Sequence, residues 1–122
     1  MAKDITLYGI KSCDTCRKAL AWLSAEGIAH VYHDFRKDGL DGAMLDVWIK
    51  ELGWETLINR RGTTWRKIPE TERQDLTPAR AKALMLANPT VIKRPVLDLG
   101  KKRLVGFTDD VKSGLAGSRQ SR

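Results

Sequence analysis

Residues 5–16 read Ile-Thr-Leu-Tyr-Gly-Ile-Lys-Ser-Cys-Asp-Thr-Cys, a short apolar segment followed by a turn and two cysteines. The apolar segment predicts a strand that ends at Gly9. The loop after it brings Cys13 to the start of a helix, which we expect over residues 14–26 because Gly27 is a helix stop signal. Residues 28–35 again have strand character. Two strands joined by a helix run parallel, so this part of the chain predicts a βαβ unit.

The middle of the chain predicts a helical insertion at about residues 39–88. Asp41 is a typical N-cap for a helix that Gly53 closes. Short helices and loops are expected after it. Thr77-Pro78 then supplies a cap and a proline at the first helical position, so residues 79–87 predict a further helix.

In the last third of the chain, the apolar residues recur with a period of two. Residues 96–99 and 103–106 predict two strands of a hairpin, and Thr108 can cap a last helix through Leu115. The order βαβ, helical insertion, ββα predicts an α/β protein with a mixed sheet, which is the layout of a thioredoxin-like fold. We expect a single domain over residues 1–122, with a flexible tail at about 116–122 that is rich in Gly, Ser and Arg.

Length and composition limit the class of protein. A chain of 122 residues can bury a core without disulfides or a structural metal. No apolar run approaches the roughly 20 residues of a membrane span, and the N-terminus lacks a signal-peptide core, so we expect a cytoplasmic protein without membrane contact. Residues 60–122 hold 15 basic and 6 acidic side chains, which favours an anionic ligand. We do not expect nucleic-acid binding, because this basic half has no recognised motif.

The two cysteines form one C-x-x-C pair, and in a reducing compartment this spacing indicates redox chemistry. Cys13 at a helix start has a stabilised thiolate and is therefore the expected nucleophile. Lys11 and Arg94 are expected to add positive charge near it. Cys16 lies one turn further on the same face, where it either resolves a mixed disulfide or fills the core as a small buried side chain.

A zinc site built from these cysteines and two histidines is not expected. His30 and His33 are separated by two residues, and on a strand an offset of three places them on opposite faces. Both rings therefore cannot easily reach the metal that Cys13 and Cys16 would bind. We predict no metal.

Three further positions are candidates for ligand binding. Pro95 follows Arg94 in an extended segment, and the thioredoxin-like layout implies a cis-proline that faces the active cysteine and binds the peptide part of a substrate. Arg60 stands in a basic turn that either binds a carboxylate or oxyanion or is simply solvated. Trp65 is near this turn and is the tryptophan that we consider able to line a ligand cleft.

Five segments together resemble the YffB branch of the arsenate reductase (ArsC)/Spx family: residues 6–15, 38–41, 51–55, 59–67 and 92–95. The resemblance extends from residue 5 to about 115. It implies a thioredoxin-like fold with a helical insertion and a glutathione-dependent thiol reductase with glutathione as co-substrate. It also implies a reactive thiol at Cys13, an anion pocket lined by Arg60 and Arg94, and an unknown disulfide or oxyanion as substrate.

Two departures from the family pattern argue against arsenate reduction in the strict sense. Family members that reduce arsenate carry a histidine four residues before the cysteine, where this chain has Gly9. They also have an arginine after the last strand, where this chain has Gly106-Phe107-Thr108. The alternative comes from the Spx branch, in which a C-x-x-C precedes a sequence like residues 17–19. It implies a redox-sensing regulator that binds the C-terminal domain of the RNA polymerase alpha subunit through a Cys13/Cys16 switch.

Overall fold

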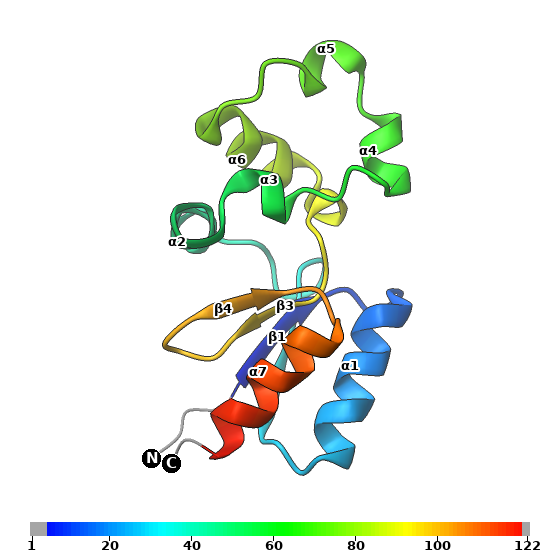
Figure 1. The fold of residues 1–122 in the computed structure, drawn as a ribbon. Helices are drawn as coiled ribbons and strands as arrows, with labels where there is room; N and C mark the ends of the chain where they lie inside the picture. The colour runs from blue at the N-terminus through cyan, green and yellow to red at the C-terminus, as the bar shows by residue number, and fades with distance from the viewer. Residues whose placement is uncertain (1–4, 121–122) are drawn as a thin grey trace. The chain divides into compact units, whose positions relative to one another are not determined.

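A computed structural model describes residues 5–120 of the chain, and the side chains of residues 5–116. Its four-stranded sheet has the order β2-β1-β3-β4 (Figure 1). The strands are β1 Ile5–Gly9, β2 His30–Asp34, β3 Val96–Asp98 and β4 Arg103–Val105. β1 runs parallel to β2 and antiparallel to β3, and β3 pairs antiparallel with β4. The predicted α/β class and the strand directions are confirmed.

The chain divides into two compact units, which are described separately. Unit 1 comprises the described residues up to Asp38 and those from Arg94 onward, and unit 2 comprises Gly39–Lys93. Unit 1 contains the sheet with helices α1 (Asp14–Ala25) and α7 (Asp109–Gln120). Unit 2 is helical and contains α2 (Gly42–Leu52), α3 (Trp54–Leu57), α4 (Thr63–Lys67), α5 (Glu70–Arg73), α6 (Pro78–Ala87) and the 3-10 turn η1 (Pro89–Val91).

In unit 1, both helices cover the same face of the sheet (Figure 1). The alternation of side chains along β1 points Ile5 and Leu7 toward the helices, and both are almost completely buried. They pack with one stripe of each helix, and this cluster is the core of the unit. Its fully buried helical members are Ala19, Leu23 and Leu115.

In unit 2, helix boundaries follow the predicted caps. Asp41 accepts a hydrogen bond from the backbone N–H of Ala43 at 2.9 Å, and Thr77 accepts one from Arg80 at 3.2 Å. Gly53 has φ of 87°, a conformation that other residues rarely adopt, and it ends α2. The side chains of Leu45 and Trp48 on α2 have no exposed surface, so this helix supplies much of the core of the unit.

The C-terminal helix differs from our prediction. We expected a flexible tail from about residue 116, but α7 continues to Gln120, and residues 121–122 lie outside the described part of the chain. Gly114 lies inside this helix. A Cβ at Gly114 would be 3.0 Å from Leu104 on β4. The glycine therefore permits close packing of helix on strand.

Among the described residues, no helix combines the length and apolar character needed to cross a bilayer.

Candidate active site

The loop between β1 and α1 presents Cys13 as the N-cap residue of the helix. Cys13 has extended backbone angles, φ −85° and ψ 118°, and its carbonyl accepts the first helical hydrogen bond from Arg17 N–H at 3.1 Å. The Cys13 N–H donates to the carbonyl of Ile10 at 3.2 Å, which closes the turn. The thiol is half-buried and free. It therefore sits where unpaired N–H groups and the helix dipole favour negative charge.

The surroundings of Cys13 stabilise its thiolate. Burial raises the pKa of this thiol, but three donors outweigh the burial: the backbone N–H of Cys16, the thiol of Cys16 and the guanidinium of Arg94. The positive charge of Arg94 adds to the hydrogen bonds, and the pKa of Cys13 is lowered overall. Cys13 is thus the thiol with the lower pKa of the two.

Cys16 lies in the core and has the opposite character. Its side chain is 1% exposed, and burial is the main reason that its pKa is raised to about 12. A Cβ placed on Gly9 would come within 2.4 Å of the Cys16 sulfur. The sulfur therefore occupies the space in which any other residue at position 9 would place its side chain.

Arg94 and Pro95 lie in unit 1 with both cysteines. The Arg94–Pro95 peptide bond is cis, as the thioredoxin-like layout implied. Pro95 is fully buried, and its carbonyl accepts a hydrogen bond from Gly106 N–H at 2.8 Å. This bond anchors the segment that carries Arg94 to the end of β4. The structure thus brings Arg94 to the sulfur of Cys13.

Sequence reasoning missed Asp34, a carboxylate that is only 7% exposed at the end of β2. One oxygen accepts hydrogen bonds from the N–H groups of Arg36 at 2.8 Å and Lys37 at 3.3 Å. The other accepts from the Tyr32 hydroxyl and from Lys11 N–H, each at 3.2 Å. Burial raises the pKa of Asp34, but these donors outweigh burial and lower it. The signal in the sequence was a lone acid near the end of the strand predicted over residues 28–35.

Lys11 contributes to the site through its backbone N–H group. Its N–H is held by Asp34, while its side chain is exposed. The bond joins the loop that carries Cys13 to the end of β2, 23 residues further along the chain. A charged acceptor makes such a bond stronger than a neutral one. Asp34 therefore holds the loop that carries Cys13 against the end of β2.

Arg60 belongs to unit 2 and lies in the turn between α3 and α4, with its side chain exposed. Its guanidinium carbon is 5.8 Å from the ring centroids of both Trp54 and Trp65. Trp65, the tryptophan singled out from the sequence, is thus a neighbour of Arg60.

The two histidines have other partners. The His30 ring is hydrogen-bonded through Nδ1 to the carbonyl of Ile28 at 2.8 Å. The His33 ring lies 4.8 Å from that of Tyr8 and 6.4 Å from that of Phe35. Within residues 5–116, no three His, Cys, Asp or Glu side chains are grouped as metal ligands.

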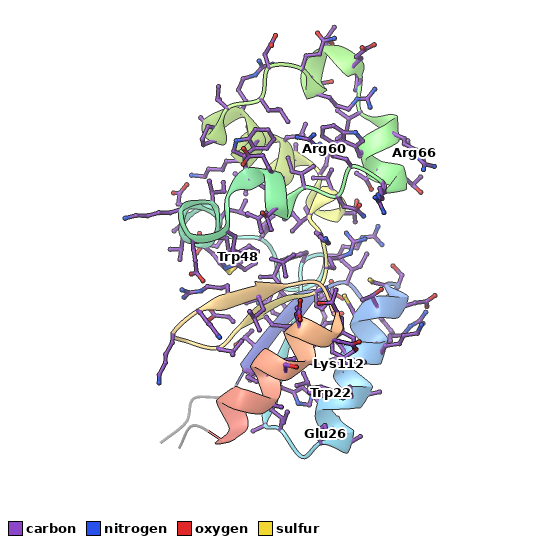
Figure 2. The ribbon with its side chains drawn as sticks, in the orientation of Figure 1. Trp22, Glu26, Trp48, Arg60, Arg66 and Lys112 are labelled. Atoms are coloured by element: carbon purple, nitrogen blue, oxygen red, sulfur yellow. The ribbon has the colours of Figure 1, made fainter. Side chains whose placement is uncertain are left out.

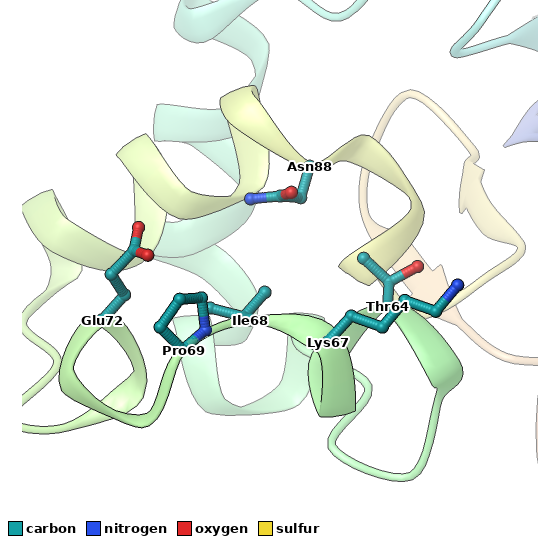
Figure 3. A pocket seen from close by; sticks show the side chains of 6 residues that line it. All are labelled: Thr64, Lys67, Ile68, Pro69, Glu72 and Asn88. Carbon is teal, nitrogen blue, oxygen red and sulfur yellow. The ribbon is translucent and has the colours of Figure 1, made fainter.

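Unit 2 also contains a pocket of about 240 Å³ (Figure 3). This volume is below the range of about 300–1,000 Å³ usual for small-molecule sites. The pocket lies in unit 2, whereas both thiols lie in unit 1, so we build the candidate active site on Cys13. The pocket is lined by Thr64, Lys67, Ile68, Pro69, Glu72 and Asn88.

Comparison with known proteins places this geometry in a family. The sequence model of the ArsC family matches residues 8–113. The chain belongs to the ArsC family. This membership confirms the resemblance to the ArsC/Spx family that the sequence motifs indicated.

Solved structures of similar sequence support the same assignment for this ArsC-family chain. A protein named YFFB is 48% identical, with a TM-score of 0.86 over 91% of this chain and 97% of that protein. An arsenate reductase (ArsC) related protein from Brucella melitensis is 46% identical, with a TM-score of 0.76 over 93% of this chain and 95% of that protein. The predicted thioredoxin-like fold of the ArsC type is confirmed.

The regulator branch is represented as well. The global transcriptional regulator Spx of Streptococcus agalactiae is 33% identical over 109 residues, which cover 87% of this chain and 78% of that protein. This ArsC-family chain is therefore similar both to arsenate reductase-related proteins and to Spx regulators.

Proposed function

We propose that this ArsC-family protein is a glutathione-dependent thiol–disulfide oxidoreductase in which Cys13 is the nucleophile. The observation that carries the proposal is the environment of the Cys13 sulfur. It lies at a helix start and accepts hydrogen bonds from Cys16 and from the Arg94 guanidinium, and its pKa is lowered. A thiolate attacks disulfides and a thiol does not, so this environment suits exchange chemistry near neutral pH.

The reaction proceeds in three exchanges. The Cys13 thiolate attacks one sulfur of a substrate disulfide, so that a Cys13 mixed disulfide forms and the other half leaves as a thiolate. A glutathione thiolate then attacks the sulfur of the bound substrate half. The Cys13 thiolate is released, and the substrate half leaves joined to glutathione. A second glutathione thiolate reduces that product, and oxidised glutathione forms. In total, two glutathione thiols are oxidised and one disulfide is reduced.

Glutathione suits the second step better than Cys16 does. The pKa of Cys16 is raised to about 12, and burial is the largest cause. A thiol attacks fastest when its pKa is near the ambient pH. The packing of the Cys16 sulfur above Gly9 further opposes the rotation that attack requires. We therefore assign Cys16 to the support of Cys13 and the resolving step to glutathione.

Binding of glutathione uses the basic residues of the chain. Its carboxylates match the permanently charged, two-pronged guanidinium groups of Arg94 and Arg60, with Lys11 adding positive charge. Pro95 presents backbone to the peptide part of the ligand. We place this reaction in the cytoplasm, where glutathione is abundant and reduced.

Arsenate reduction in the strict sense is not proposed. The histidine that arsenate-reducing members carry at the position of Gly9 has no room beside Cys16, since even a Cβ there would be 2.4 Å from the sulfur. The substrate class that we propose is a disulfide, including mixed disulfides of glutathione.

The experiment is mass spectrometry of the intact protein after incubation with oxidised glutathione at pH 7. We expect one glutathione adduct on Cys13 in the wild type and in Cys16→Ser, and none in the matched variant Cys13→Ser. Absence of the adduct from both the wild type and Cys16→Ser contradicts the proposal.

The similarity to Spx supports a second candidate function, a redox-sensing regulator that binds the RNA polymerase alpha subunit. Its switch is a disulfide between Cys13 and Cys16, which are adjacent free thiols here. Co-purification with RNA polymerase under reducing and oxidising conditions separates the two functions. Binding in one redox state alone favours the regulator, and binding in neither favours the enzyme.

A further inference from the structure

Two tryptophan rings of unit 2 are within cation–π distance of the Arg60 guanidinium. The guanidinium carbon of Arg60 is 5.8 Å from the ring centroids of Trp54 and Trp65. The guanidinium carbon of Arg73 is 5.5 Å from the ring centroid of Trp65. Contacts up to about 6 Å are attractive because the ring face is electron-rich. In Figure 2, Arg60 lies inside the ring of chain that runs from α3 to α6, whereas Arg66 points outward.

The backbone that carries Arg60 is fixed on both sides. The Asn59 side chain accepts a hydrogen bond from Arg61 N–H at 3.1 Å, and Asn59 N–H donates to the carbonyl of Val91 at 2.9 Å. A Cβ on Gly62 would be 2.9 Å from the Asn59 amide nitrogen, so the turn is closely packed. The starting point of the Arg60 side chain is therefore well defined.

The α4 helix that carries Trp65 is tied to η1. The hydroxyls of Thr64 and Thr90 are hydrogen-bonded at 2.6 Å. Trp54 opens α3 directly after Gly53, where φ is 87°. Both rings thus come from anchored segments, and they can hold a guanidinium that is otherwise on a flexible stem.

The N–H donors of the Arg60 guanidinium are not used inside the protein. Within the described side chains, residues 5–116, Arg60 forms no ion pair and its guanidinium donates no hydrogen bond. Ring contacts engage the face of a guanidinium and leave the donors at its edge for a planar anion. This combination describes an arginine that is ordered but still has all of its donors available.

We propose that Trp54 and Trp65 are positioning residues that hold Arg60 ready to bind an anionic group of the co-substrate. The inference rests on the proposed function, which assigns Arg60 to the carboxylates of glutathione. Immobilising a side chain as flexible as arginine on binding opposes affinity. An arginine that aromatic rings have already ordered avoids most of this loss. The two rings therefore raise affinity without touching the ligand.

The test measures binding by calorimetry in the Cys13→Ser background, so that no covalent adduct forms. The probes are reduced glutathione and inorganic sulfate, which separate recognition of a carboxylate from that of an oxyanion. We expect Trp54→Leu and Trp65→Leu to weaken binding of glutathione by about threefold to tenfold, the range expected for one newly immobilised side chain. Trp65→Phe, which keeps an aromatic face, restores most of the affinity.

A matched control is Trp22→Leu. Trp22 is a partly buried tryptophan of unit 1, and its ring is 5.8 Å from that of Phe107. No arginine among residues 5–116 is in cation–π contact with it. We expect unchanged affinity in this variant. In reactions with the active protein, the Trp65→Leu effect appears in KM for glutathione and leaves kcat unchanged.

A second measurement needs no variant. The side-chain N–H of Arg60 in the wild type is expected to be rigid on the nanosecond timescale by NMR and shifted by the indole rings. A mobile, unshifted signal overturns the inference. The inference is also overturned if Arg60→Ala weakens binding but both Trp→Leu variants leave it unchanged. In that case the proposed function stands. If Arg60→Ala binds glutathione as tightly as the wild type does, Arg60 does not recognise glutathione, and the inference is overturned. The glutathione adduct on Cys13 still tests the reductase proposal separately.

Discussion

Replacement of Gly9 by alanine tests the close packing of the Cys16 sulfur against Gly9. The added Cβ would be 2.4 Å from the Cys16 sulfur and 3.3 Å from the Cys16 Cβ, whereas ordinary contacts are 3.4–4 Å. The overlap with the sulfur is therefore about 1 Å. Overpacking of this kind costs about 1–3 kcal/mol. We expect Gly9→Ala to lower the free energy of unfolding by that amount.

A double-mutant cycle isolates the contact. Cys16→Ala removes the sulfur and leaves space for one methyl group, so Gly9→Ala should cost much less in that background. We expect a coupling energy of about 1–2 kcal/mol between the two positions, within the range for residues in contact. The assay is urea unfolding under reducing conditions. A loss of 2 kcal/mol lowers the urea midpoint by about 0.7–2 M for the m-values usual in small proteins.

The cycle has a clear contrary outcome. If Gly9→Ala costs the same in both backgrounds, within about 0.5 kcal/mol, the sulfur does not occupy the space above Gly9. The steric argument against a histidine at this position would then fail as well.

Two further predictions concern charge at the site. Arg94→Ala should raise the pKa of Cys13, which is read from the pH dependence of iodoacetamide alkylation in the Cys16→Ser background. Substitution of the neighbouring exposed residue, Lys93→Ala, should leave this pKa unchanged. An unchanged pKa in Arg94→Ala refutes the role of the guanidinium. Asp34→Asn should lower stability at pH 7 by about 2–3 kcal/mol, because it removes charged hydrogen bonds inside the protein. The folded-state pKa of Asp34 is lowered, so its stabilisation is present above the unfolded value of about 3.9 and is lost as pH falls through the folded value. Equal unfolding curves of both proteins at pH 7 would show that the carboxylate contributes nothing.

Local signals in the sequence were sufficient for most of the fold. Gly27, with φ of 67°, follows the residue that caps α1, and the cap at Asp41 starts α2, as predicted. These signals act within one or two turns of the residue that carries them. The last helix was predicted to end at Leu115, but α7 continues to Gln120, and the glycine inside it, Gly114, is explained by close packing against Leu104 on another element.

The candidate site divides in the same way. The position of Cys13 at a helix start is a local property, and it was predicted. Asp34 was missed because its role depends on an N–H group 23 residues away, at Lys11. The contacts of Arg60 were missed for a similar reason. Trp54 and Trp65 lie six and five residues from it along the chain, and these spacings match no regular contact within one helix or strand.

The burial of Cys16 changes how the C-x-x-C motif is to be understood in this chain. Cys16 donates two hydrogen bonds to the Cys13 sulfur, while its own pKa is raised to about 12. We propose that a second cysteine of this kind activates the first and is slow to attack a mixed disulfide itself. A protein with one working thiol needs an external thiol to complete its reaction. If that thiol is glutathione, as we propose, anion recognition by arginines becomes part of the chemistry, and the basic second half of the chain has a function that its charge alone did not specify.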